Sequence, residues 1–147
     1  MFFVDTGLLA SQLEHGTAAR ILSGDPSAYK GAMAENMVAV AFANDGRSLY
    51  YFHASSGSPN LDFVANLLGE PTIVECKSNN GRATSMKYAL ANAKRYGVHP
   101  AVKFADTNVG GGKGFVTLPL YALGFLPAPE EPLMVPEVSI ELSGEGV

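Results

Sequence analysis

Three strand-like runs follow one another in the middle of the chain, between two segments of helical composition. The runs cover residues 48–53, 61–68 and 72–77, and stretches rich in Gly, Ser and Pro separate them. A helix rich in Ala, Met and Val is predicted before them, at residues 31–44, and an amphipathic helix after them, at residues 84–96. Strands that follow one another so closely in sequence favour a three-stranded meander, which limits the fold to architectures that contain one.

Beyond the second helix the pattern continues with a strand at 101–105, a glycine-rich loop and a strand at 114–118. The order helix, three strands, helix, strand is typical of α/β proteins and predicts a mixed sheet flanked by helices, with an αβββαβ core.

The chain has 147 residues, of which 47% are hydrophobic, so it can bury one sizeable core. We therefore expect a single domain over residues 1–126. Its first 30 residues form a helical lead-in, in which Asp5 caps or turns the chain before Leu8. Residues 127–147 contain four of the nine prolines and five glutamates, and they predict an extended tail.

The charges are distributed unevenly along the chain. The net charge of −4 argues against non-specific coating of nucleic acid, because that mode depends on many cations. Seven of the ten basic residues nevertheless lie between residues 77 and 113, where Asp106 is the only acid. The candidate nucleic-acid contacts in this stretch are Arg82, Lys87, Lys94 and Arg95. An ordinary solvated helix face explains the same charge pattern.

Two acids and a lysine lie within the second and third strand-like runs. If a two-residue turn at Gly69-Glu70 closes this hairpin, Asp62 lies opposite Lys77, and Glu75 shares their face. Directly opposed residues lie about 5 Å apart and diagonal ones about 7–8 Å, so the two carboxylates can bracket one divalent cation. We predict Asp62 and Glu75 as ligands of magnesium or manganese. Lys77 is the predicted catalytic cation, acting on the attacking water or on a phosphate.

Glu35 is the only charged residue of the predicted helix at 31–44. A lone acid in an apolar helix needs a partner if it is buried, so we expect it to reach the same cluster. The alternative is a simple cross-strand ion pair of Asp62 with Lys77 and a solvent-facing Glu35, because a Glu-x-Lys pattern by itself is a weak signal.

The order of these residues resembles that of the PD-(D/E)xK nuclease superfamily. Four segments, Phe3–Leu9, Glu35-Asn36, Asp62–Val64 and Glu75–Lys77, are similar to the C-terminal domain of unknown function that follows the ATPase module of many bacterial and archaeal AAA+ ATPases. The similarity runs from about Phe2 to Leu126.

The resemblance implies a restriction-endonuclease-like fold, with Asp62 and Glu75 as metal ligands, Lys77 as the catalytic cation and Glu35 as an auxiliary acid. The chain departs from the pattern where Leu61 replaces the proline before the first acid, and residues 92–96 match the Gln-x-x-x-Tyr motif of some relatives only loosely.

The resemblance favours a metal-dependent nuclease acting on DNA or RNA. One alternative is an inactive module that binds nucleic acid or a protein partner, and another is a scaffold without activity.

Other functional classes are less compatible with the sequence. The loop at 110–114 is not a nucleotide-binding P-loop, because Thr107 occupies the place of its first glycine and Gly114 that of the Ser or Thr that binds magnesium. We expect no ATP site and no ATPase module in this chain. The single cysteine, Cys76, is expected to be a small buried core residue. The absence of a long apolar run and of a signal-like N-terminus predicts a cytoplasmic protein without a membrane partner.

Overall fold

A computed structural model describes residues 2–25, 29–53, 59–67, 69–79, 81–97 and 100–126. The tail predicted for residues 127–147 lies outside the described residues. The helices, in chain order, are α1 (Thr6–Ser11), α2 (Thr17–Leu22), α3 (Lys30–Asn44), α4 (Thr84–Ala91), α5 (Ala93–Tyr96) and the 3-10 helix η1 (Leu120–Phe125). The strands are β1 (Leu49–His53), β2 (Asn60–Leu67), β3 (Glu70–Lys77), β4 (Ala101–Ala105), β5 (Gly110–Gly112) and β6 (Phe115–Pro119).

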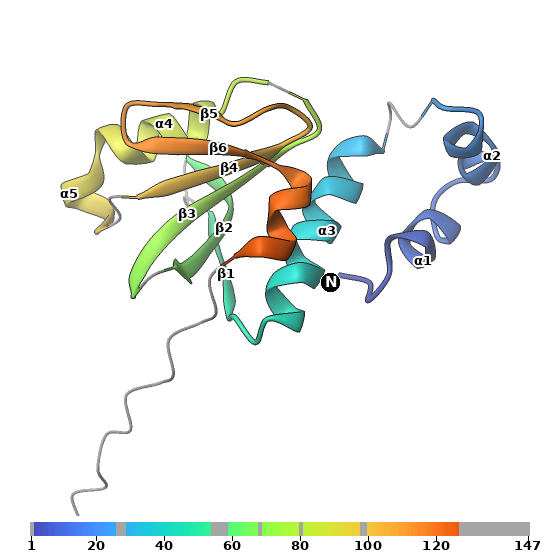
Figure 1. The fold of residues 1–147 in the computed structure, drawn as a ribbon, viewed down its shortest axis with the longest axis horizontal. Coiled ribbons are helices and arrows are strands. Elements are labelled where there is room, and N and C mark those ends of the chain that lie inside the picture. Colours follow the sequence, from blue (N-terminus) through green and yellow to red (C-terminus); the bar gives the residue numbers. More distant parts are fainter. Residues whose placement is uncertain are drawn as a thin grey trace, which may run out of the picture.

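Within the described residues, the strands form one sheet in the order β1-β2-β3-β4-β6-β5. The first three strands pair antiparallel as the predicted meander, whereas β3 with β4 and β4 with β6 pair in parallel. The short β5 runs antiparallel to β6 at the edge. The prediction of a mixed α/β sheet with flanking helices is confirmed, and Figure 1 shows the helices on both sides of it.

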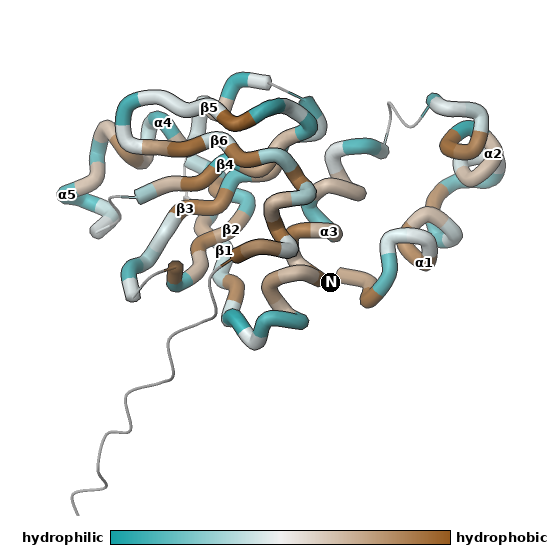
Figure 2. Tube along the Cα trace, in the orientation of Figure 1, coloured by the Kyte–Doolittle hydropathy of each residue, from teal (hydrophilic) through white to brown (hydrophobic). Residues whose placement is uncertain are grey.

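Each face of the sheet buries its own apolar cluster. The first face packs against α3 and η1, and its buried residues are Val38, Ala39, Phe42, Phe63, Ala65, Leu67, Val74, Cys76 and Phe104. The second face packs against α4, and its buried residues are Leu61, Ile73, Ala83, Met86, Ala89 and Ala101. Hydrophobic stretches along the central strands are visible in Figure 2. A sheet covered on both faces needs such nearly continuous apolar strands.

The N-terminal segment is held to α3 by one buried amide. The side chain of Asn36 is 1% exposed, accepts a hydrogen bond from the backbone N–H of Phe3 and donates one to the carbonyl of Phe3. Asp5 caps α1 as predicted, because its carboxylate accepts from the N–H groups of Gly7 and Leu8. The helices α1 and α2 lie beyond α3, away from the sheet (Figure 1).

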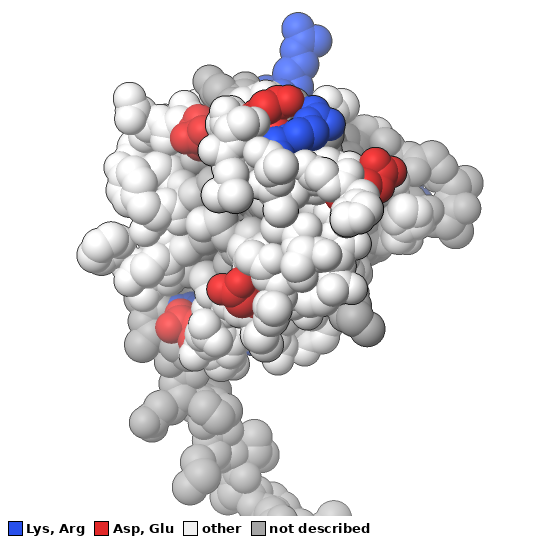
Figure 3. Space-filling view, turned by 90° about the vertical axis from the view of Figure 1, so that its right-hand side faces the viewer, with Lys and Arg blue, Asp and Glu red and all other residues white. Residues whose placement is uncertain are grey.

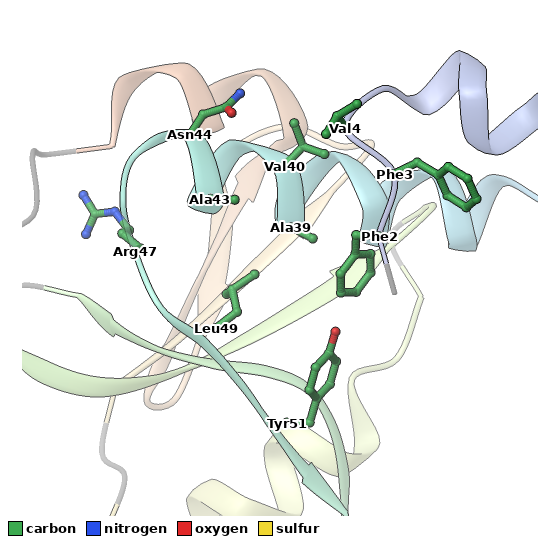
Figure 4. A pocket seen from close by; sticks show the side chains of 10 residues that line it. All are labelled: Phe2, Phe3, Val4, Ala39, Val40, Ala43, Asn44, Arg47, Leu49 and Tyr51. Atoms are coloured by element: carbon green, nitrogen blue, oxygen red, sulfur yellow. The ribbon is translucent and has the colours of Figure 1, made fainter.

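An apolar cavity of about 320 Å³ lies where this N-terminal segment meets α3 and β1. Figure 4 shows the side chains that line it, which come from all three segments. The ring of Phe2 stacks on that of Tyr51, with 6.1 Å between the ring centroids. The ring of Phe63 lies 5.5 Å from that of Phe2. These aromatic contacts extend the core of the first face toward the N-terminus.

Three element predictions need correction. The helix predicted at 84–96 is divided at Asn92 into α4 and α5. The N-terminal lead-in contains two helices with residues 12–16 between them, and Gly16, which precedes α2, has a φ of 91°. The glycine-rich loop includes the edge strand β5, whose hairpin with β6 turns at Lys113-Gly114. The final helix η1 was not predicted, because its sequence Leu-Tyr-Ala-Leu-Gly-Phe has no cap or polar face.

Candidate functional site

A bulge in β2 places Asp62. Tyr50 pairs with Val64 and Phe52 with Leu61, so the single residue Tyr51 lies opposite two residues of β2, Asp62 and Phe63. Regular alternation would put Leu61 and Phe63 on one face, yet Phe63 packs under α3 and Leu61 packs under α4. Bulges of this two-against-one kind bend a strand and re-aim its side chains. Asp62 lies at the point where the strand switches faces.

The predicted register between β2 and β3 is wrong by two residues. The paired residues are Phe63 with Val74 and Leu67 with Glu70, so the connection consists of residues 68 and 69 rather than Gly69-Glu70. Gly69 has a φ of 81°, a left-handed conformation that glycine adopts without strain, so it lies inside the turn and Glu70 begins the strand. A shift of two preserves the face of each side chain, whereas a shift of one would reverse it.

Lys77 joins the two predicted metal ligands. Its Nζ lies 2.7 Å from Glu75 Oε1 and 3.5 Å from Asp62 Oδ2. Asp62 Oδ2 also accepts a 2.8 Å hydrogen bond from the backbone N–H of Cys76. The bulge and this hydrogen bond together fix the Asp62 carboxylate over the end of β3. The structure therefore brings together three of the residues singled out in the sequence, through contacts of a single ammonium group.

Burial controls the electrostatics of this cluster. The side chain of Glu75 is only 3% exposed, and burial, followed by the charge of Asp62, raises the pKa of its carboxyl even though the hydrogen bond from Lys77 opposes the shift. Burial alone would lower the pKa of Lys77. Its hydrogen bond to Glu75 and the two nearby carboxylates outweigh that effect and raise the pKa, so Lys77 is a charged ammonium group rather than a base.

Glu35 lies on α3 and is half-buried. Burial and the charge of Asp62 raise the pKa of Glu35, while the charge of Lys77 lowers it, so the acid lies within electrostatic range of the cluster. Over the described part of the chain, no three His, Cys, Asp or Glu side chains form a group arranged to hold a metal ion. The charge of Glu35 in turn raises the pKa of Glu75, so Glu35 acts electrostatically on both acids.

One atom of the cluster lacks a partner. Glu75 Oε2 is buried and makes no hydrogen bond within the described residues. A buried carboxylate oxygen without a donor carries a large desolvation penalty. Oxygen of this kind is the ligand that magnesium and manganese prefer, so the donor set fits a hard divalent cation. The residues able to hold it are Glu75 and Asp62.

The four cations predicted to contact nucleic acid fall into two groups. Arg82 and Lys87 line a polar cavity beside the cluster, whereas Lys94 and Arg95 belong to α5, where the Arg95 guanidinium lies over the ring of Tyr96. The face on the α1–α2 side has mostly uncharged atoms with scattered charges (Figure 3). Sequence reasoning singled out neither Lys103 nor Thr117, which are buried and line the same cavity. The feature of the sequence that could have identified Lys103 is its position as a cation inside the otherwise apolar strand 101–105.

Cys76 is buried in the apolar cluster of the first face, under α3, which confirms its predicted place in the core. Burial, and then the surrounding carboxylates, raise the pKa of its thiol, so it remains a neutral core residue.

These features define a mixed α/β domain with a buried acid–lysine cluster beside a strand bulge. The family model described as "Domain of unknown function (DUF4143)" matches residues 30–123, which is more than half of the chain, and the protein belongs to this family. The match begins at the first residue of α3 and ends within η1, so it covers the whole sheet and the cluster.

No curated protein and no solved structure gives a significant match to the chain. Among the described residues, none of the helices is long and apolar enough to cross a membrane.

Proposed function

We propose that this protein is a metal-dependent phosphodiesterase that acts on DNA or RNA through the cluster of Asp62, Glu75 and Lys77. The observation that carries the proposal is the unpartnered, buried Oε2 atom of Glu75, beside a second carboxylate in contact with the same lysine. A buried charged cluster contributes little net stability, and strongly perturbed carboxyl groups gather at functional sites.

The residue order supports an assignment to the PD-(D/E)xK nuclease superfamily and a restriction-endonuclease-like fold. The similarity to the domain that follows the ATPase module of AAA+ ATPases supports an origin in such a protein. The antiparallel meander continued by the parallel strand β4, with helices on both faces, agrees with that assignment.

Each residue has a role that follows from its surroundings. Asp62 and Glu75 would hold magnesium or manganese through their carboxylate oxygens, and the chemistry that the ion would supply is polarisation of a phosphodiester and activation of a water. Lys77 stabilises the negative charge that develops on the phosphate, because its ammonium group stays protonated between two acids. The elevated pKa of Glu35 suits it to accept or return a proton at the edge of the cluster.

A second candidate function is an inactive module that binds nucleic acid or a protein partner. The observation in its favour is that Lys77 already pairs with both carboxylates, so the acids have a charge partner without a metal ion. The two functions differ in whether the cluster binds a metal ion and in whether the strand is cut.

The test measures both properties on the same preparations. Chelator-treated protein is titrated with manganese and magnesium by calorimetry, and then incubated with plasmid, single-stranded DNA and RNA. We expect metal-dependent cleavage that falls at least about a hundredfold in Asp62→Asn, which loses a metal ligand, and by roughly 10²–10³-fold in Lys77→Met, which loses a donor to the developing charge.

Two matched variants serve as controls. Asp45→Asn removes an acid that pairs with Arg47, and Glu70→Gln changes an exposed acid at the start of β3, so both should cleave as the wild type does. The proposed nuclease activity is rejected if metal binds without cleavage in any preparation, or if cleavage survives in Asp62→Asn. Binding of nucleic acid without either metal binding or cleavage supports the inactive module.

A further inference from the structure

A cavity of about 350 Å³ adjoins the acid–lysine cluster on the side of the sheet covered by α4. Its walls come from the loop before α4, from α4 itself, from β4 and β6, and from β5 with the loop that leads into it. The lining residues are Gly81, Arg82, Ala83, Lys87, Lys103, Thr107, Asn108, Val109, Gly110, Gly111, Phe115 and Thr117. We call it the cationic cavity.

Three cations from three elements line the cationic cavity, and none of its described lining residues is acidic. Arg82 precedes α4, Lys87 lies on α4 and Lys103 lies on β4. Lys103 is only 6% exposed, so its charge is screened far less than that of a surface lysine. The whole chain carries a net charge of −4, which makes this cavity a local exception that favours an anion.

The remaining polar groups suit the oxygens of a phosphate. Thr107, Asn108 and Thr117 present hydroxyl and amide donors, and the backbone of Gly110-Gly111 forms part of the wall. A Cβ atom at Gly111 would lie 2.8 Å from the carbonyl oxygen of Phe115, so this position excludes any side chain. Glycine-rich backbone also lines many phosphate sites, where it can approach the anion closely.

The cationic cavity and the acid–lysine cluster are neighbours in the sheet. Lys103 on β4 pairs with Glu75 on β3, and adjacent strands lie about 4.8 Å apart, so their side chains leave the same face side by side. A Cβ atom at Gly81, a residue of the cavity wall, would lie 3.9 Å from Lys77 Cδ. An anion in the cavity would thus be next to the residues proposed to act on a phosphodiester.

We propose that the cationic cavity binds a backbone phosphate of a nucleic-acid strand, adjacent to the phosphodiester that the cluster attacks. Arg82, Lys87 and Lys103 neutralise this phosphate, and the cavity thereby sets the position of the strand relative to Glu75 and Lys77. The choice of a strand as the source of the phosphate rests on the proposed function, whereas the preference for phosphate rests on the cavity alone.

The experiment uses a fluorescently labelled single-stranded oligonucleotide and measures its anisotropy with the full chain in a chelator, so that no metal ion is needed. In Arg82→Gln/Lys87→Gln we expect binding to weaken by about tenfold to a hundredfold, since one charge-assisted contact is worth roughly tenfold and the variant removes two. The slope of log K against log salt should become shallower by about 0.7, the contribution of one phosphate contact with a single strand.

Lys94→Gln/Arg95→Gln is the matched control, because it removes the same charge from α5, outside the cationic cavity. It should weaken binding by less than about threefold, as loss of a distant charge does. Thr117→Val supplies a second cavity variant that keeps the side-chain shape, and it should also weaken binding. Equal losses in the two double variants, or no loss in the cavity double variant, overturn the proposal.

Competition identifies the source of the phosphate. Inorganic phosphate and a 5′-mononucleotide are each added against the labelled strand. If both compounds compete only at concentrations far above the concentration at which an unlabelled oligonucleotide competes, the occupant is a strand. A mononucleotide that competes as well as the oligonucleotide overturns it and makes the cavity a small-phosphate site.

Asp62→Asn separates this proposal from the proposed function, since it should lower cleavage at least about a hundredfold and leave strand binding intact. Retained binding with no cleavage in any preparation rejects the enzyme and keeps the cavity assignment. Cleavage by the wild type that is unaffected by the cavity variants, together with unchanged binding, rejects the cavity alone.

Discussion

Beyond its exposed start at Glu70 and Pro71, β3 divides into a first half, residues 72–74, and a second half, residues 75–77, which have opposite chemistry. Ile73 and Val74 in the first half are fully buried and pack into the two separate apolar clusters, one on each face of the sheet. Glu75 in the second half is 3% exposed and carries a carboxylate with one unpartnered oxygen. Burial therefore stabilises the fold in the first half, and in the second half it perturbs a charged group.

The difference shows which part of the strand the fold depends on. Burying an aliphatic side chain contributes about 1.5–3 kcal/mol to the free energy of unfolding. Burying a carboxylate costs free energy unless a partner compensates for it. Among the described residues, Glu75 Oε1 has Lys77 as a hydrogen-bond partner and Oε2 has none. The second half of β3 is thus held in place by the first half and by its neighbours, β2 and β4.

The largest effect on stability should come from the apolar half. Ile73→Ala is expected to lower the free energy of unfolding by about 3 kcal/mol, because it leaves a cavity between β3 and α4, and Ile73→Val by about 1 kcal/mol. Urea denaturation at pH 5 and at pH 8 measures both values. Since Ile73 carries no charge, the two pH values should give the same loss. A loss below about 0.5 kcal/mol for Ile73→Ala, the size of a surface substitution, would contradict the assignment of this position to the core.

Much of this fold was predictable because its elements have strong local patterns. The strand at 101–105 has the bounds of β4, and the helix at 31–44 differs from α3 by one residue. Connections were harder to predict. The position of the turn between β2 and β3 depends on which of its two residues is the glycine with the positive φ. Both the predicted turn, Gly69-Glu70, and the observed turn, residues 68–69, contain Gly69, so either is compatible with the sequence. The sequence could not decide between them, because the packing that selects the register is tertiary.

The candidate site was predicted as a set of residues but not as a geometry. Asp62, Glu75 and Lys77 do come together, although regular pairing was expected and a bulge at Asp62 was not. A bulge leaves no mark in the composition of β2, whose residues alternate in burial along the strand. Lys103 was missed for a related reason: its role depends on β4 lying next to β3, a parallel pairing between segments far apart in sequence.

An intermediate effect should come from removing the cation of the second half. Lys77→Met leaves Glu75 and Asp62 without their shared ammonium group, so the pKa of Glu75 should rise further above its ordinary value. We expect a loss of about 2 kcal/mol at pH 8, less than for a fully buried pair because the lysine is 30% exposed. The loss should shrink as the pH falls toward 4.5, where the carboxyls take up protons. A loss that does not vary with pH would show that the lysine acts through packing.

The smallest effect has the opposite sign. A carboxyl whose pKa is raised by folding favours the folded state at low pH and loses this contribution as the pH rises from 4.5 through the raised value. Glu75→Gln removes the charge and keeps an oxygen for Lys77, so it should stabilise the protein by about 1 kcal/mol at pH 8, with a gain that disappears near pH 4. Thermal denaturation across this range measures it, with Glu70→Gln at the exposed start of β3 as the control that stays near zero. Stabilisation by Glu75→Gln together with loss of cleavage would mean that the buried acid is kept for its chemistry at the expense of stability. A destabilised Glu75→Gln protein would instead make Glu75 a structural partner of Lys77, and the contrast between the two halves of β3 would be lost.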